Sequence, residues 1–442
     1  MDFTPTEEQE AARELAARVF GDLATHERLR AAGAGTDAEL WKALCAAGLP
    51  GAVEDTGLLG LVLLLEEQGR VTAQVPFAAT CVYGLLAVTR HGTAEQRARL
   101  LPGLRDGTTV ITGALPAGGV VSTAHEARGR ATAPADGGEL RQGRAPNPTT
   151  PGPPPGPIGE PLLPASGGES LLPVSGGESL PPASGGESLP PVSGGESLPP
   201  VSGGEPLPPA SGGGRLSGVV DWVPWLRDAT HVLVPDADRA LWLVRTEDAA
   251  AVESVELTAP WSAGRLVLAE TPAERLGAAA ERPGAPTEAR AAAHDDVLAA
   301  ARIAFAGLQA GVCAGSLARA VAYTSVREQF GRPLATHQAV QLRAADAHMD
   351  TEAIRVTAYE AAWRFDEGLD AEAAALTAAW WASEAGKRVV HAGQHLHGGM
   401  GADLDHPVHR HFLWGRQLDA YLGCGTELLA ELGDLLAKGD PS

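Results

Sequence analysis

The stretch YTSVREQFGRPLATHQAVQ, residues 323–341, separates two long helical patterns in the last third of the chain. Its central glycine and proline form a turn signal, so we expect one helix to end before them and another to begin by Gln338. Arg327, Phe330 and Gln338 then meet at one helix junction. A guanidinium for phosphate, a ring for stacking and an amide for directional hydrogen bonds suit a nucleotide cofactor. From these residues alone, a salt bridge with a core phenylalanine explains the pattern equally well.

The chain around this stretch is predicted to be helical from 290 to 438. Amphipathic runs rich in Ala, Leu, Glu and Arg mark four helical segments, at 294–330, 335–368, 370–399 and 407–437. The third run ends in a pair of glycines, which is a natural helix stop.

Residues 1–108 are also predicted to be helical. Thr4 and Glu7 have the spacing of a capping box at the start of the first helix. Glycine and proline then divide the segment, and further helices are expected around 37–48, 58–70 and 94–104.

The middle of the chain has a different character. Short β-branched runs bounded by turn residues predict a β-domain from 109–141 and 215–285. Between them, at 142–214, a unit close to GGESLPP[AV]S repeats so that glutamate recurs every nine residues from Glu160 to Glu205. The unit lacks the aspartates of calcium-binding β-helix repeats and often has two prolines. We therefore expect a disordered linker, with a peptide site for a partner as the alternative.

Composition excludes several classes of function. The net charge is −21 and the chain has no basic tract, so we expect no nucleic-acid partner and no docking on anionic membranes. The four cysteines lie far apart without a CxxC pair, which predicts no metal site and fits a reducing cytoplasm. The first twenty residues are acidic and lack the apolar core of a signal peptide.

The stretch 323–341 resembles the R-x-x-F-G-x-x-[LI]-x-x-x-Q signature of the acyl-CoA dehydrogenase family, and HLHGGMG at 395–401 resembles its Q-x-x-G-G-x-G turn. Residues 1–20 and 91–107 resemble its N-terminal helical domain. The resemblance implies an α+β multidomain fold, with an N-terminal α-helical domain, a middle β-domain and a C-terminal four-helix bundle. Members of the family are usually tetrameric and bind FAD.

The resemblance also implies which residues contact the cofactor. The signature and the glycine turn reach across a dimer interface in the family and hold the FAD of the neighbouring subunit. The positions that match are Arg327, Phe330, Gln338, His395, Gly398 and Gly399, with His395 standing where the family turn has glutamine. SGVVDWVPWL resembles the family's G-x-K-x-W-I-T segment, which lines the flavin. Trp222 is kept there, but Pro224 replaces the hydroxyl residue.

The family's catalytic base has no counterpart in this sequence. Family enzymes remove the proton next to the thioester carbonyl with Glu or Asp while the flavin accepts a hydride. The common base position, in a Y-E-G-T segment after Tyr421, is Leu422, and the alternative position is Ala301. Arg302 matches a substrate-side arginine, and Tyr421 also belongs to the implied substrate site. Two nearby acids, Asp419 and Glu427, are weaker candidates for a base.

The resemblance therefore implies α,β-dehydrogenation of an acyl-CoA thioester, with this chain as the base-lacking subunit of a heteromeric complex. Its expected partners are a homologous dehydrogenase subunit, acyl-CoA and an electron-transfer flavoprotein. One alternative is a homomeric flavoenzyme, either a dehydrogenase with an unrecognised base or a flavin monooxygenase of the same fold. The other is a structural homologue without enzymatic activity.

Overall fold

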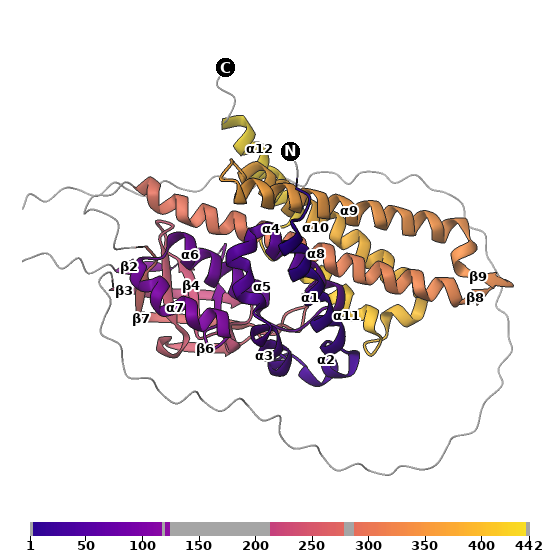
Figure 1. The fold of residues 1–442 in the computed structure, drawn as a ribbon, viewed down its shortest axis with the longest axis horizontal. Coiled ribbons are helices and arrows are strands. Elements are labelled where there is room, and N and C mark those ends of the chain that lie inside the picture. Colours follow the sequence, from indigo (N-terminus) through magenta and orange to yellow (C-terminus); the bar gives the residue numbers. More distant parts are fainter. Residues whose placement is uncertain (1–2, 117–119, 124–212, 278–286, 439–442) are drawn as a thin grey trace, which may run out of the picture. The chain divides into compact units, whose positions relative to one another are not determined.

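The computed structural model describes residues 3–116, 120–123, 213–277 and 287–438. Nearly all of the predicted repeat insertion at 142–214 lies outside these residues; its last two positions belong to strand β3. The described residues have three parts, which are an N-terminal set of helices, a mixed sheet and a C-terminal helical bundle (Figure 1). The predicted fold class is confirmed.

The N-terminal part is helical, as predicted. Its helices are α1 (Glu7–Leu23), α2 (His26–Ala32), α3 (Ala38–Ala46), α4 (Leu49–Val71), α5 (Phe77–Ala79), the π-helix η1 (Thr80–Leu86), α6 (Ala87–His91) and α7 (Ala94–Asp106). Helix α3 lies within the segment expected around 37–48, and α4 and α7 include those expected around 58–70 and 94–104.

The predicted capping box at Thr4 and Glu7 lies two residues too early in the sequence, because the structure forms it with Thr6 and Gln9. The helix begins at Glu7, and Thr6 is its N-cap, accepting a hydrogen bond from the Gln9 backbone N–H at 3.2 Å. The Gln9 side chain also donates to the Thr56 carbonyl oxygen on α4 at 2.9 Å. A tertiary contact thus supports the register that begins at Glu7, which the local motif alone did not reveal.

Helix α4 is bent at Gly57, whose φ of 71° interrupts the helical backbone. The second half of the helix begins there with free backbone donors. Asp366 at the end of α9 (Gln338–Asp366) accepts from Leu58 N–H at 2.8 Å and from Leu59 N–H at 2.9 Å. One carboxylate from the bundle therefore caps a helix of the N-terminal part.

Among the described residues the sheet has seven strands, in the order β1-β4-β5-β7-β3-β2 with β6 beside β7. The strands are β1 (Ile111–Gly113), β2 (Val121–Thr123), β3 (Gly213–Val223), β4 (His231–Pro235), β5 (Leu241–Arg245), β6 (Ala251–Ser254) and β7 (Gly264–Arg275). The pair β1–β4 is parallel and the other pairs are antiparallel. Alternation places Leu266 and Leu268 of β7 in the core.

The bundle contains α8 (Thr287–Val326), α9, α10 (Glu372–Leu396) and α11 (Pro407–Leu418), and α12 (Gly425–Lys438) follows. Helix α8 is long and apolar enough to span a membrane, but most of that apolar window is buried inside the protein. It packs against α4, α9, α10 and α11, so the core accounts for its composition.

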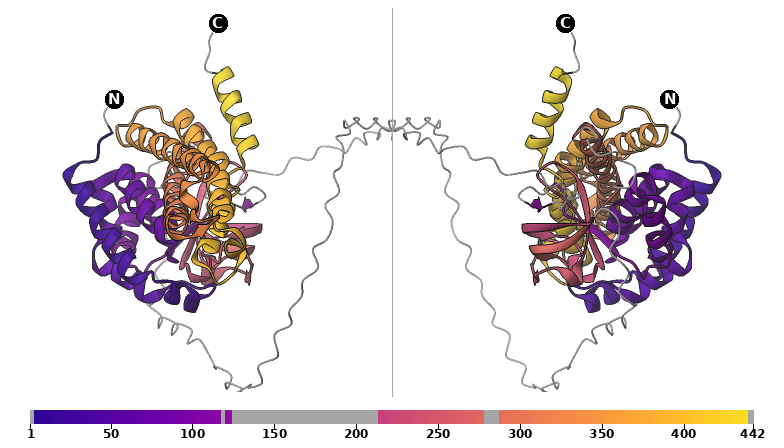
Figure 2. Two further views of the ribbon diagram at one scale, coloured as in Figure 1. Left: turned by 90° about the vertical axis from the view of Figure 1, so that its right-hand side faces the viewer. Right: turned by 90° about the vertical axis from the view of Figure 1, so that its left-hand side faces the viewer.

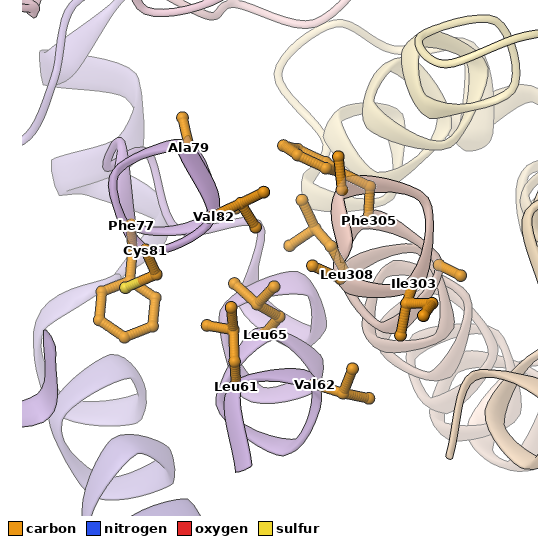
Figure 3. Packing of buried hydrophobic residues seen from close by; sticks show 14 of the residues in the cluster. Leu61, Val62, Leu65, Phe77, Ala79, Cys81, Val82, Ile303, Phe305 and Leu308 are labelled. Carbon is orange, nitrogen blue, oxygen red and sulfur yellow. The ribbon is translucent and has the colours of Figure 1, made fainter. Parts of the chain in front are cut away.

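One hydrophobic core joins the N-terminal helices to the bundle. Leu61 and Leu65 of α4 lie between Phe77 on one side and Phe305 and Leu308 of α8 on the other (Figure 3). The N-terminal helices and the bundle thus form neighbouring layers (Figure 2). Domains of this size obtain most of their stability from such burial.

Candidate functional site

The 323–341 stretch forms an exposed hairpin between α8 and α9. Strands β8 (Glu328–Gln329) and β9 (Arg332–Pro333) pair, and the short 3-10 helix η5 (Leu334–Thr336) leads into α9 (Figure 1). Phe330 has a left-handed backbone with φ of 57°, and its side chain is 90% exposed. Phe330 is therefore not a core residue, and the alternative interpretation of this stretch is wrong.

The other two signature residues are exposed as well. The side chains of Arg327 and Gln338 face solvent, and within the described part of the chain Arg327 makes no side-chain hydrogen bond or ion pair. Arg332 lies close by, with a guanidinium nitrogen 3.2 Å from Nδ1 of His337. The structure thus brings two arginines, an aromatic ring and an amide to one protruding surface, which suits a phosphate-bearing ligand from outside the chain.

The glycine turn follows α10 as the 3-10 helix η6 (Gly398–Ala402). His395, Gly398 and Gly399 are exposed, and a Cβ added at either glycine meets nothing within 4 Å, so another molecule can approach their backbone. The neighbouring Gln394 points inward and donates to the Gly401 carbonyl at 3.1 Å. That amide holds the turn together, which leaves His395 as the outward side chain.

Both base positions lie in packed protein. Leu422 is 5% exposed and Ala301 is fully buried. Leu422 lines a residual space of only about 20 Å³ between α8, α10 and the 421–428 segment. Neither side chain accepts a proton, so the structure offers no base at either position.

Aromatic side chains fill the junction between the sheet and the bundle. The Tyr421 ring lies 4.7 Å from Phe305, 5.6 Å from Trp222 and 6.0 Å from Trp261, centroid to centroid. The Tyr421 hydroxyl is 2.8 Å from that of Tyr83 on η1. Trp261 also stacks on Trp225 at 4.5 Å. We call these six residues, with Trp414, the aromatic cluster.

The tyrosines of this cluster are not proton acceptors. Burial raises the pKa of both Tyr83 and Tyr421, so both stay protonated. Of the two weaker acid candidates, Asp419 is already engaged, whereas Glu427 lines a cavity beside the cluster. Asp419 accepts from Ser383 Oγ at 2.7 Å and pairs with Arg416 at 3.2 Å. A hydrogen bond from Cys424 N–H lowers the pKa of Glu427.

A cavity of about 360 Å³ remains beside the cluster. It is lined by residues 114–116, by residues 219–222 and by Ala420, Tyr421, Gly423 and Glu427. Among these described residues the charged side chains are Asp221 and Glu427, both acidic. Asp221 lies 3.6 Å from Nε of Arg265, which is not part of the lining, so the described wall of the cavity presents two carboxylates and no cation to the phosphates of FAD and of CoA.

Arg302 does not point freely toward a substrate. Its guanidinium forms a two-point ion pair with Glu431 of α12, with distances of 2.8 Å and 2.6 Å. The Arg302 side chain is 8% exposed. Sequence reasoning missed this partner because Glu431 lies on an amphipathic helix where an acid normally faces solvent. It also missed Tyr83, Trp225, Trp261 and Trp414; the nine tryptophans of the chain were the available signal.

Comparison with known proteins agrees with the geometry of the helices. A family model described as acyl-CoA dehydrogenase, N-terminal domain, matches residues 6–108, and one described as acyl-CoA dehydrogenase, C-terminal domain, matches residues 291–430. Together they cover more than half of the chain. The chain belongs to the acyl-CoA dehydrogenase family.

Among curated relatives, the chain is similar to the acyl-CoA dehydrogenase FadE27 of Mycobacterium tuberculosis, with 37% identity over 236 residues. That match covers 51% of this chain and 61% of the relative, so the chain spans less than two thirds of the relative's length. A second acyl-CoA dehydrogenase of the same organism, FadE28, is 33% identical over 28% of this chain and 36% of its own length.

Solved acyl-CoA dehydrogenases share the fold of the described residues. A variant of the Tcur3481-Tcur3483 steroid ACAD is 34% identical with a TM-score of 0.73, and the match covers 99% of each chain. The ChsE4-ChsE5 complex from Mycobacterium tuberculosis is 25% identical with a TM-score of 0.73, over 100% of both chains. The family implies FAD. The exposed hairpin and turn fit that cofactor, whereas the acidic, aromatic-filled cleft does not.

Proposed function

We propose that this chain is the base-lacking subunit of a heteromeric acyl-CoA dehydrogenase and completes the flavin site of a base-bearing homologue. The observation that carries the proposal is the contrast between two regions. Leu422 stands at the base position inside a packed cleft, while the residues that match the family's contacts to a neighbour's cofactor are exposed.

The chain's own cleft argues against a second, complete active site. Trp222 and Trp261 both pack on Tyr421 where the sheet meets the bundle. Pro224 supplies no hydroxyl group, and its carbonyl already accepts a hydrogen bond from Thr112 Oγ1 at 2.6 Å. An anionic cofactor entering the remaining cavity meets Asp221 and Glu427. We therefore expect about one FAD for each pair of subunits.

The hairpin and the turn carry side chains that could contact an FAD bound mainly by a neighbouring subunit. Arg327 would bind a phosphate, Phe330 would stack on a ring, and Gln338 and His395 would form hydrogen bonds. Gly398 and Gly399 leave room for close backbone approach. FAD supplies hydride acceptance when bound, and the α-proton would go to a carboxylate of the partner.

An exposed apolar row on α9 supports association with another subunit. Leu342, Met349 and Val356 recur every seven residues and are 58%, 64% and 49% exposed. Helix α9 begins at Gln338, so this row continues from the hairpin. Apolar rows with this spacing are typical of helix–helix interfaces. A tetramer of two unlike pairs accords with the family.

The substrate class is inferred from the similar solved structure. Because the 34% identical structure is a steroid ACAD, we infer a bulky polycyclic acyl-CoA thioester as substrate. An electron-transfer flavoprotein would be the acceptor, and the four unpaired cysteines are compatible with the cytoplasm.

Two alternative functions make different predictions. A homomeric flavoenzyme would be yellow and active when purified alone, and Asp419 or Glu427 would then be its first candidate bases. A structural homologue would bind no flavin even in the presence of partners.

The decisive experiment is co-expression with a base-bearing acyl-CoA dehydrogenase subunit encoded nearby. We expect a stable complex with about one FAD per pair of subunits and turnover only in the complex. Leu422→Glu should not activate the isolated chain, because its flavin face is filled. Brisk turnover by the unmodified chain alone would overturn the proposal.

A further inference from the structure

His397 connects the two elements that face the cofactor. The imidazole is 3% exposed and stacks on Tyr323, with ring centroids 4.9 Å apart and planes 21° apart. On another side it lies 5.0 Å from the His406 ring. Nδ1 lies 2.7 Å from the Gly393 carbonyl oxygen; because that oxygen only accepts, Nδ1 carries the proton and donates.

The stack on Tyr323 and the chain itself link His397 to the two halves of the cofactor-facing surface, which are the hairpin at Arg327 and the turn at Gly398. Tyr323 lies in the last turn of α8, and its carbonyl oxygen accepts from Arg327 N–H at 2.9 Å. His397 itself directly precedes Gly398, the first residue of the turn. The chain between Arg327 and Gly398 contains the two complete helices α9 and α10. The stack of His397 on Tyr323 is therefore a direct contact between two segments that are distant in the sequence.

We propose that His397 is a positioning residue that fixes the spacing between Arg327 and the Gly398–Gly399 turn, so that both reach one cofactor. This inference rests on the proposed function. Its physical basis is the combination of a flat ring for stacking with one directional hydrogen bond. The bond to Gly393 sets the plane of the ring, and the ring plane sets where the end of α8 lies.

The imidazole is suited to this role in a way that a purely apolar side chain is not. Phenylalanine retains the stack on Tyr323 but leaves the Gly393 carbonyl without this donor, so the ring can turn. Alanine removes both contacts. The series His397→Phe and His397→Ala therefore separates the two components of the positioning.

The test measures FAD dissociation from the heteromeric complex for Arg327→Ala, His397→Phe, His397→Ala and the double variant Arg327→Ala/His397→Ala. We expect His397→Ala to raise the Kd for FAD roughly tenfold, comparable to one lost charge-assisted hydrogen bond, and His397→Phe to raise it less. In the Arg327→Ala background the effect of His397→Ala should largely disappear, because the two act together. The matched control is His294→Ala, a 9% exposed histidine near the other end of α8.

The outcomes separate the two proposals. If Arg327→Ala leaves FAD binding unchanged, the proposed function fails. If Arg327→Ala weakens binding but His397→Ala behaves like His294→Ala, or if the two effects add independently, the positioning inference is overturned. Should His397→Ala not fold, Tyr323→Leu removes the stack from the other ring and must show the same coupling to Arg327.

Discussion

The hydroxyl groups of Tyr83 and Tyr421 lie 2.8 Å apart where the three parts of the protein meet. Tyr83 comes from the π-helix η1, and Tyr421 follows α11. A Cβ added at Gly113 of β1 would come within 2.5 Å of the Tyr83 ring, so the sheet closes tightly on the same point. A π-helix inserts an extra residue into a helical turn and often serves a local requirement. Here it belongs to the segment that presents Tyr83 to Tyr421 and closes the cleft.

Replacing both tyrosines of this pair should destabilise the protein by less than the sum of the two single replacements. Tyr83→Phe leaves the buried Tyr421 hydroxyl without its partner, which costs about 1–3 kcal/mol of unfolding free energy. Once Tyr421→Phe is present, removal of the second hydroxyl should cost much less. Urea unfolding of both single variants and the double variant measures this coupling. Strict additivity would show that the hydroxyl pair contributes no interaction energy.

Loss of the Asp366 carboxylate should weaken the contact between the bundle and α4. Asp366→Ala removes two acceptors from the backbone donors of Leu58 and Leu59, and a helix cap of this kind contributes about 1 kcal/mol. Glu367→Ala, at the exposed neighbouring residue, serves as the control. Thermal unfolding should show a lower Tm for the first variant alone; equal Tm values would argue against the cap.

The buried His411 predicts a loss of stability in mild acid. Burial, followed by the positive charge of Arg319, lowers its pKa to about 4, despite carbonyl oxygens at 3.1 Å and 3.0 Å from its ring nitrogens. The pKa of a histidine in an unfolded chain is about 6.5. The unfolded chain therefore takes up the proton first, so the stabilisation present above pH ~6.5 is lost as the pH falls toward 4.

Inside that pH window His411 should lower the free energy of unfolding by about 1.4 kcal/mol for each unit that the pH falls. Urea unfolding at several pH values should give a shallower decline for His411→Gln than for the unmodified protein. Parallel curves would mean that His411 does not titrate on unfolding.

Removing the partner of Arg302 should be costly. Glu431→Gln leaves a guanidinium that is 8% exposed without its counter-charge, and we expect a loss of about 1–3 kcal/mol, moderated by the half-exposed position of Glu431. Asp434→Asn on the same exposed helix is the matched control and should change stability little. Similar midpoints of urea unfolding for the two variants would contradict a stabilising Arg302–Glu431 pair.

The sequence by itself determined the helical parts, the family and the lack of a carboxylate at the two base positions that the resemblance implies. Helical periodicity is local, so the junction at 323–341 and helices such as α7 follow from residues near in the chain. The identity of Leu422 excludes proton abstraction at that position whatever surrounds it. The exposure of Phe330 was not predictable from residues alone, because an aromatic ring at a helix junction is equally compatible with a core.

Only the tertiary structure decided what fills the cleft. Tyr83 and Tyr421 are separated by more than three hundred residues, and Trp222, Trp261 and Phe305 come from three further segments. Their contacts depend on how the sheet packs against the bundle, and no local pattern encodes that packing. The ion pair between Glu431 and Arg302 also depends on packing. The spacing of Glu431 in the sequence indicates a helical surface, but it does not indicate which residue Glu431 binds. Local sequence therefore specifies helices and chemical groups, whereas packing between distant segments decides which of those groups remain free to bind a ligand.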